Sequence, residues 1–174
     1  MHDFDELAAR CAEFTIQSLS DLTDRTTQAL TESGSTSLVK TLQMINLQKS
    51  ILAVGMFSVF EAYLQDRLNC KDGFLAVREK LDQAGALTLK ENFLDIASAI
   101  NVLKHGRGRS YNHLIENSER LPFRVKYTGE DYFEEGDVSE VLSLIDVNDD
   151  FIRLCGDTIR EVSEFLRTSD MAQP

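Results

Sequence analysis

Apolar residues recur every three or four positions along most of this chain, which is the spacing of a helical face rather than of a strand. In the first segment one such stripe consists of Phe4, Leu7, Cys11, Phe14, Ser18 and Leu22. Asp3 followed by Glu6 is an acidic N-cap pattern, and Gly34 between serines is a stop signal. The pattern predicts a first long helix with this stripe as its apolar side.

A second long helix is predicted from about residue 37 to residue 69. The apolar side of its first half is formed by Leu38, Leu42 and Ile45. Residues 51–64 are instead apolar nearly all round, and a helix with that composition is buried. We therefore predict that this is the central helix of a bundle, with Gly55 and Ser58 allowing another helix to pack closely.

Two capping patterns follow the second helix. Asp72-Gly73 is predicted to open a short helix that closes near Gly85. Thr88, with Glu91 three residues later, matches a capping box, in which the hydroxyl and the carboxylate each bind the other residue's backbone N–H. The sequence therefore predicts a further helix starting at Thr88.

The helix that starts at Thr88 is predicted to end at Gly106, and Ser110 is a candidate cap for another short helix. Its apolar stripe is Leu89, Phe93, Ile96, Ile100 and Leu103. Residues 120–136 break the helical pattern, since apolar and basic residues alternate there from Phe123 to Tyr127. We expect an irregular surface excursion or a small hairpin in this region.

A final helix is predicted to start at Asp137, with Glu140 three residues on. Its heptad positions are Val138, Val141, Ile145, Asn148, Ile152, Cys155, Ile159, Val162 and Leu166, of which only Asn148 is polar. The predicted fold is thus all-α, a helical bundle with two to three long helices, short helices and an irregular or hairpin excursion near 120–136. Residues 1–170 are expected to form one domain and 171–174 a tail.

Composition adds few constraints to this picture. The 174 residues include only two prolines, which favours helix, and three widely spaced cysteines, which support neither a zinc site nor a disulfide framework. Cys11 and Cys155 fall on apolar stripes and are expected to be buried free thiols. No cofactor or metal is expected.

The formal net charge is −11, which opposes general attraction to nucleic acid or to an anionic membrane. Neither DNA nor a membrane is an expected partner. The longest apolar run, residues 51–64, is too short to span a bilayer and contains Glu61. Because the N-terminus is acidic and lacks an apolar core, no signal peptide is expected, and the cytoplasm is the expected location.

One basic segment stands out in this acidic chain. Four potentially cationic side chains, Lys104, His105, Arg107 and Arg109, lie within seven residues and are interleaved with Gly106 and Gly108. Glycines let a backbone turn tightly and expose its N–H groups, and a helix starting just after Ser110 would add the positive end of its dipole. This combination suits a phosphate or phosphodiester, with His113 as a second imidazole in the same region. In the alternative interpretation, Gly106 only ends a helix whose dipole the cations complement.

One helix face and one acidic residue are further candidates for a functional role. On the helix that precedes the basic segment, Leu94, Ser98, Asn101 and His105 share the side opposite the apolar stripe, which is either a contact face or a solvated one. Glu61 stands among apolar neighbours on the second helix. It is either a partner in a buried ion pair, for which Lys104 and His105 are candidates, or a catalytic base with a raised pKa.

The segment Asn101-Val102-Leu103-Lys104-His105-Gly106 resembles the motif of the HEPN superfamily of small helical bundles, which places Arg, a polar residue, three more residues and then His-Gly near a helix end. The stretch from Phe57 to Leu64 is also similar to the central helix of HEPN proteins of the bacterial toxin and defence type. The resemblance covers roughly residues 38–113. It implies a homodimer and, in active members, metal-independent RNA cleavage by Arg and His acting together across the dimer interface.

The chain departs from the motif at Ile100, which stands where the arginine is expected. The resemblance therefore implies a diverged member, in which Arg107 or Arg109 would have to supply the missing cation. Arg107 and His113 also fit a looser Arg-x5-His spacing.

Three functions remain open from the sequence. The first is binding of RNA, a nucleotide or a partner protein through residues 104–113. The second is a metal-independent endoribonuclease with His105 and Asn101 as catalytic residues, and Glu61 as a further candidate. The third is a purely structural, dimeric adaptor. A homodimer is expected in each case, with Leu94, Ser98 and Asn101 on the available face.

Overall fold

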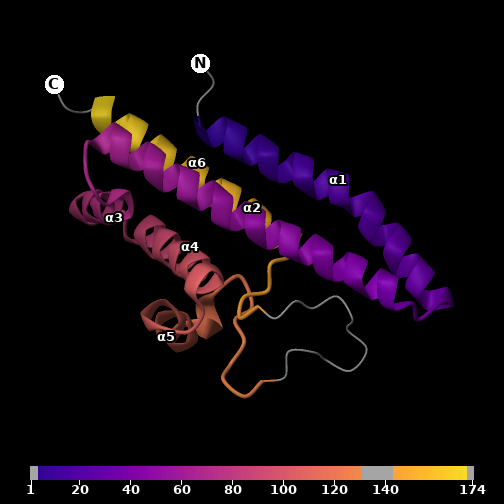
Figure 1. Ribbon diagram of the computed structural model, residues 1–174. Helices are drawn as coiled ribbons and strands as arrows, with labels where there is room; N and C mark the ends of the chain where they lie inside the picture. Colours follow the sequence, from indigo (N-terminus) through magenta and orange to yellow (C-terminus); the bar gives the residue numbers. More distant parts are fainter. Residues whose placement is uncertain (1–3, 131–142, 172–174) are drawn as a thin grey trace.

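The computed structural model describes residues 4–130 and 143–171 (Figure 1). The helices are α1 (Phe4–Glu32), α2 (Thr36–Leu68), α3 (Gly73–Gln83), α4 (Leu87–His105), α5 (Arg109–Glu116) and α6 (Asp149–Met171), with a short 3₁₀ turn at Ser118–Arg120. Within these residues there is no strand, only one isolated antiparallel bridge between Val125 and Ile145. The predicted all-α class, with long and short helices, is confirmed.

The long helices α1 and α2 lie side by side and antiparallel, and α6 packs against both of them (Figure 1). The shorter helices α3 and α4 pack against α2 as well, and α5 packs against α4. Because α2 contacts α1, α3, α4 and α6, its predicted place at the centre of the bundle is confirmed.

Local signals explain where α2 and α3 begin and end. The Ser35 side chain accepts a hydrogen bond from the Ser37 N–H at the start of α2, and Asn69 ends the helix in the left-handed conformation at φ 47°. Asp72 caps α3 by accepting from the Leu75 N–H at 2.9 Å. Gly73 is required beside it, because an added Cβ would lie 2.8 Å from the Leu64 Cβ. The predicted Asp72-Gly73 helix start is confirmed.

The main core lies where α2, α4 and α6 meet, and its largest fully buried side chains include Phe57, Phe60, Phe93 and Phe151. A separate small cluster of three buried residues, Leu19, Leu42 and Ile45, lies between α1 and α2 alone. It belongs to the part of the two helices that extends beyond α6, which we call the arm (residues 18–48; Figure 1). The arm therefore has far fewer buried contacts than the rest of the bundle.

The predicted apolar stripe of α1 is wrong as a core face. Phe14 is 70% exposed and Leu7 is 51% exposed, and Cys11 is also exposed rather than buried. The helix instead buries smaller side chains, including Ala8 and Ala12. Small residues let α1 approach α6 closely, since a Cβ added to Gly156 would lie only 3.6 Å from the Ala9 Cα. Cys155, by contrast, is buried as predicted.

Two predicted caps are also wrong. The helix α4 starts at Leu87 with Ala86 as its N-cap, so Thr88 lies inside it. The turn that ends α3 sets this start, because the Ala86 N–H donates to the Leu81 carbonyl at 2.9 Å while Gly85 adopts φ 69°. Likewise α5 starts at Arg109, so Ser110 lies in its first turn instead of capping it.

The last helix starts at Asp149 rather than at the predicted Asp137, which lies outside the described residues, as does the predicted cap Asp3 of α1. Ile145 pairs with Val125 in the bridge, and the Lys126 N–H donates to the Leu144 carbonyl at 3.0 Å. The described part of the predicted excursion near 120–136 therefore pairs with the segment before α6.

Asn148 is the N-cap of α6. Its side-chain oxygen accepts from the Phe151 N–H at 2.9 Å, and Asp149 and Asp150 provide negative charge in the first turn. The one polar residue of the predicted heptad pattern is thus the point where the helix begins.

Candidate functional site

The basic segment forms the connection between α4 and α5. The helix α4 ends at His105, and the Gly106 N–H donates to the Val102 carbonyl at 2.8 Å. Gly106 has φ 72° and ψ −142°, a backbone conformation essentially restricted to glycine. Gly108 is extended at φ 173°, which any residue adopts, and α5 follows at once. Gly106 therefore determines the direction in which the chain leaves α4.

This connection surrounds an open hollow of about 270 Å³. Its lining residues are Asn101, His105, Gly106, Arg107, Gly108, Arg109 and Ser110. The structure thus brings together most of the residues that the sequence nominated for a phosphate site. Lys104 is exposed next to this group but does not line the hollow.

The cations around the hollow lack acidic partners. Within the described part of the chain, no ion pair or side-chain hydrogen bond involves Lys104, His105, Arg107 or Arg109, and all four are exposed. Most arginines elsewhere in the described residues pair with carboxylates, Arg78 being an exception; the pairs include Arg10–Glu6, Arg25–Asp21, Arg120–Asp95, Arg124–Glu130, Arg160–Asp157 and Arg167–Asp5. In a chain with a net charge of −11, the hollow is a local concentration of uncompensated positive charge.

The start of α5 adds backbone donors beside these cations. Its N-cap is Gly108, which has no side chain to accept from the first N–H groups, and the first backbone bond of the turn runs from the Asn112 N–H to the Gly108 carbonyl at 3.0 Å. The N–H groups at the first helical positions lack intrahelical acceptors. An anion in the hollow would therefore find both charged side chains and backbone donors.

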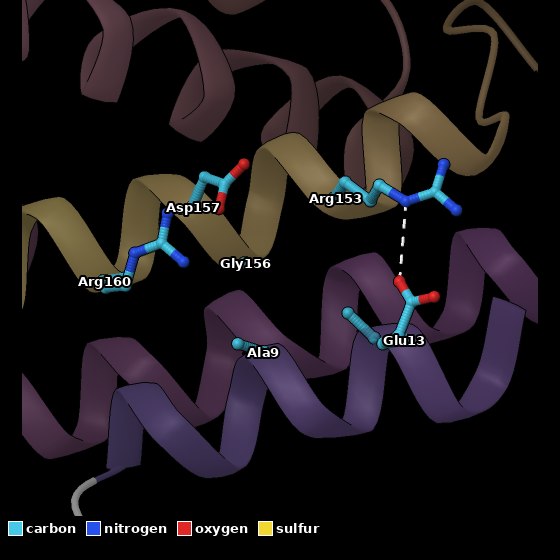
Figure 2. A pocket seen from close by; sticks show the side chains of 7 residues that line it. Ala9, Glu13, Arg153, Gly156, Asp157 and Arg160 are labelled. Carbon is cyan, nitrogen blue, oxygen red and sulfur yellow. Dashed lines mark hydrogen bonds and ion pairs between the residues drawn. The ribbon is translucent and has the colours of Figure 1, made fainter.

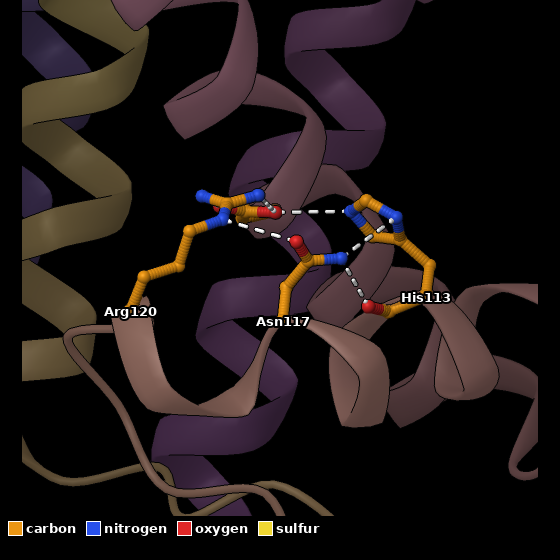
Figure 3. Close-up of polar contacts among 4 residues, drawn as sticks. His113, Asn117 and Arg120 are labelled. Atoms are coloured by element: carbon orange, nitrogen blue, oxygen red, sulfur yellow. Dashed lines mark hydrogen bonds and ion pairs between the residues drawn. The ribbon is translucent and has the colours of Figure 1, made fainter.

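A second polar group lies deeper, between α4 and the segment after it (Figure 3). Asp95 of α4 is 2% exposed and accepts from the Arg120 Nη2 at 3.0 Å, while the Arg120 Nη1 binds its other oxygen. The His113 Nε2 lies 3.0 Å from the Asp95 Oδ1, so it is the nitrogen that carries the proton in this contact. Asn117 completes the group, accepting from the Arg120 Nε at 3.2 Å and donating to the His113 carbonyl at 2.8 Å.

This network, which we call the Asp95 cluster (Asp95, His113, Asn117 and Arg120), attaches α5 and the 3₁₀ turn to α4. It places His113 away from the lining of the hollow, so the predicted phosphate-binding role of His113 is not supported by its position. The cluster instead fixes how α5, and with it Arg109 and Ser110, is oriented relative to α4.

Asp95 and Arg120 are not among the residues predicted from the sequence. A signal was present, because Asp95 is the one acidic residue inside a run, residues 93–100, whose other members are apolar or small. An acidic residue on such a run requires a partner when it is buried. The identity of that partner, 25 positions away in the chain, was not readable from spacing.

Two further predictions are corrected by burial. Glu61 is only half-buried, so the expected need for a buried ion-pair partner does not arise. Of the face predicted from Leu94, Ser98 and Asn101, Ser98 is buried at 5% exposure, Leu94 is half-buried and Asn101 lines the α4–α5 hollow.

A second hollow of about 210 Å³ lies between α1 and α6 (Figure 2). Its charged residues are already paired, since the Arg153 Nε lies 3.5 Å from the Glu13 Oε2 and the Arg160 Nη2 lies 2.7 Å from the Asp157 Oδ1. Four charges that compensate one another attract an anion less than the uncompensated cations at the α4–α5 connection do.

Over the described ranges, no group of three His, Cys, Asp or Glu side chains is arranged to hold a metal ion. No helix in the described residues has the length and apolar content needed to cross a membrane. Comparison of the chain with protein-family models, with curated proteins and with solved structures finds no significant match. The HEPN resemblance therefore rests on the residues of the sequence and stays a prediction.

Proposed function

We propose that this protein binds RNA through the phosphodiester backbone at the α4–α5 connection. The observation that carries the proposal is the set of exposed cations Lys104, His105, Arg107 and Arg109, which have no acidic partner in the described residues. Asn101, Ser110 and the start of α5 supply further donors at the same hollow. Phosphate oxygens accept hydrogen bonds from all of these groups.

The shape of the site favours single-stranded RNA over a duplex. The hollow of about 270 Å³ can hold a phosphate with part of one nucleotide, but its basic residues span only a short loop. The remaining charge of the chain is strongly negative and repels a long polyanion. Contact with a few phosphates of a flexible strand avoids most of that repulsion.

A titration of a short single-stranded RNA, followed by fluorescence anisotropy at several salt concentrations, tests this proposal. Arg107→Ala/Arg109→Ala is expected to weaken binding and to lower the slope of log K against log salt by about 1.4, since each contact to a single-stranded phosphate contributes about 0.7. Arg153→Ala/Arg160→Ala is the matched control, because it removes the same formal charge from arginines that carboxylates already neutralise. Equal losses in both variants, or none in the first, would contradict a local phosphate site.

The second candidate function is cleavage of that RNA, and it is favoured by one observation. His105 and Asn101 line the same hollow as Arg107 and Arg109, so a proton-transferring imidazole and two cations could reach one phosphodiester. Attack of the 2′-OH on the phosphorus needs a base for its proton and an acid for the leaving oxygen. The lining contains one imidazole and no carboxylate, which makes binding the better supported function.

Incubation of mixed RNA with the protein in EDTA separates the two functions. RNA that stays intact while the anisotropy titration shows binding supports a binding protein. Cleavage that is lost in His105→Ala supports a metal-independent ribonuclease. Cleavage that persists in His105→Ala comes from a different site or from a contaminant.

A further inference from the structure

The central helix α2 is apolar on a side that the bundle does not cover. Ile51 is 63% exposed and Val59 is 56% exposed, while Met44 and Leu47 are about half exposed at 51% and 49%. The buried residues of α2, among them Ala53 and Phe60, lie on its other side. Single exposed apolar residues are common on protein surfaces, but a row along one helix marks a contact site.

A matching row runs along α1. It consists of Leu7, Phe14 and Leu22, which are 51%, 70% and 38% exposed. At about 100° per residue, this row lies roughly 160° from the α1 side that meets α6 through Asp5 and Ala9. The row on α2 is likewise roughly 140° from the side where Lys49 and Met56 meet α6. Both rows therefore lie on the surface of the α1–α2 pair that faces away from α6.

The two rows also have the same register. The stacking of Phe4 on Phe60 and Tyr63, with centroid separations of 5.8 and 5.5 Å, fixes how the antiparallel helices align. Counting from this contact at equal rise per residue, Leu7 lies level with Val59, Phe14 with Ile51 and Leu22 with Met44. We call this surface the outer face; its residues are Leu7, Phe14, Leu22, Met44, Leu47, Ile51 and Val59, with the small exposed residues Cys11, Ser18, Gly55 and Ser58 between them.

The outer face carries little charge on its α2 side. Between residues 41 and 60 the one charged residue is Lys49, which is 9% exposed and paired with Asp149 at 2.6 Å. Nucleic acid and an anionic membrane both select basic surfaces, and an interfacial helix flanks its apolar side with Lys and Arg. The basic residues near the α1 row, Arg10 and Arg25, are paired with Glu6 and Asp21, so the row has no basic border and neither of those partners fits.

We propose that the outer face binds the outer face of a second copy of this chain. Its seven large side chains expose on the order of 600 Å² of apolar surface, comparable with the roughly 800 Å² that each partner buries in a standard interface. A two-fold axis in the plane of the interface places the α1 row of one copy against the α1 row of the other, and likewise for α2. The two antiparallel helices of each copy then form a four-helix bundle across the interface. The small residues between the rows let the backbones approach closely.

A second copy also stabilises the arm. Beyond α6, the apolar core of the arm consists of Leu19, Leu42 and Ile45 with the partly buried Leu30, and an isolated helix pair with so small a core is marginal in water. Leu22, Met44 and Leu47 of the outer face lie on this arm. Covering these side chains adds buried apolar area to the part of the monomer that has the smallest apolar core. The interface lies away from the α4–α5 hollow.

Sedimentation equilibrium of the full chain tests the proposal. The wild type is expected at twice the 19.6 kDa of one chain. Phe14→Glu/Ile51→Glu introduces charges at two level positions of the outer face and is expected to weaken association about 1,000-fold, as the loss of two central contacts does. Leu75→Glu/Leu87→Glu is the matched control, because these leucines are 44% and 56% exposed outside that face; it is expected to remain dimeric.

The proposal would be overturned by a wild type that stays monomeric at concentrations on the order of 100 micromolar. It would also be overturned if the outer-face variant stayed dimeric, or if the control variant dissociated to the same extent. If the outer-face variant does not fold, the exposed thiol of Cys11 provides a second measurement. Its reaction with a maleimide is expected to slow as the wild-type concentration rises, because dimerisation covers it. A rate independent of concentration would count against the outer face, and the partly exposed Cys70, which lies outside that face, serves as the internal reference.

Discussion

Asp5 in the first turn of α1 accepts two hydrogen bonds from the guanidinium of Arg167 in α6, at 3.1 and 3.0 Å. Burial is the largest influence on this carboxyl and raises its pKa. The hydrogen bonds and positive charge of Arg167, with the backbone N–H groups of Asp5 and Glu6, outweigh burial and hold the pKa of Asp5 below its usual 3.8. The ionised form therefore stabilises the contact between α1 and α6.

This pair predicts a pH-dependent stability difference between the wild type and Asp5→Asn. Because the folded pKa is lower than the unfolded one, the contribution is complete above the unfolded value of 3.8 and is lost as the pH falls through the folded pKa. We expect Asp5→Asn to unfold more easily at pH 7, by about 1–2 kcal/mol, and the difference to shrink at strongly acidic pH. Urea denaturation at several pH values measures it; a difference independent of pH would contradict the assignment.

The two glycines of the α4–α5 connection are expected to respond differently to alanine. Neither has a neighbour within 4 Å of an added Cβ, so backbone conformation alone distinguishes them. Gly106→Ala places a side chain at φ 72° and is expected to cost about 1–3 kcal/mol and to weaken RNA binding. Gly108→Ala, at an extended φ of 173°, should be tolerated. Thermal unfolding compares the two, and equal effects would argue against the role of Gly106 in directing the chain.

Removal of the α6 cap should destabilise the bundle. Asn148→Ala deletes the oxygen that accepts the Phe151 N–H and is expected to cost about 1 kcal/mol. Asn148→Asp keeps an acceptor at the same position and should retain most of the stability. Chemical denaturation measures both variants. If alanine and aspartate behave alike, the hydrogen bond contributes little and the start of α6 is determined by packing.

The Asp95 cluster predicts a larger loss. Arg120→Met removes the two hydrogen bonds that the guanidinium makes to the buried carboxylate, leaving Asp95 with His113, and is expected to cost about 2–3 kcal/mol. Arg124→Met is the control, since its partner Glu130 is in a more exposed ion pair. Combining Arg120→Met with Asp95→Leu should recover part of the stability, because no charge is then buried unpaired. Failure to recover would mean that the arginine acts mainly through packing.

Helix locations followed from residue periodicity, but the buried side of α1 did not. The large residues Leu7 and Phe14 indicated one face, whereas the helix packs through Ala8 and Ala12. Hydrophobic periodicity is recognised mainly from large apolar residues, whereas two helices approach each other most closely where their side chains are small. Leu7, Phe14 and Leu22 do form one row on α1, but that row lies on the surface of the molecule.

The α4–α5 hollow was largely predictable because six of its seven lining residues are contiguous, from His105 to Ser110. Contiguous residues around two glycines lie close together whatever the rest of the fold does. The Asp95 cluster was not predictable, since it joins residues 18 and 25 positions apart whose proximity depends on how α5 packs. For the same reason the sequence could not show that His113 contacts Asp95 and does not line the hollow.

The contact between α1 and α6 has a consequence for synthesis on the ribosome. Roughly 120 residues separate the end of α1 from the start of α6. At about 5–20 residues per second, translation takes on the order of ten seconds to cover that distance. Throughout this interval Ala9 and Ala12 lack the α6 segment at Gly156 against which they pack, and Asp5 lacks Arg167. The nascent α1 can therefore pack only against α2 during this interval. The side of α1 that α6 later covers is exposed for that time and is available to bind a chaperone.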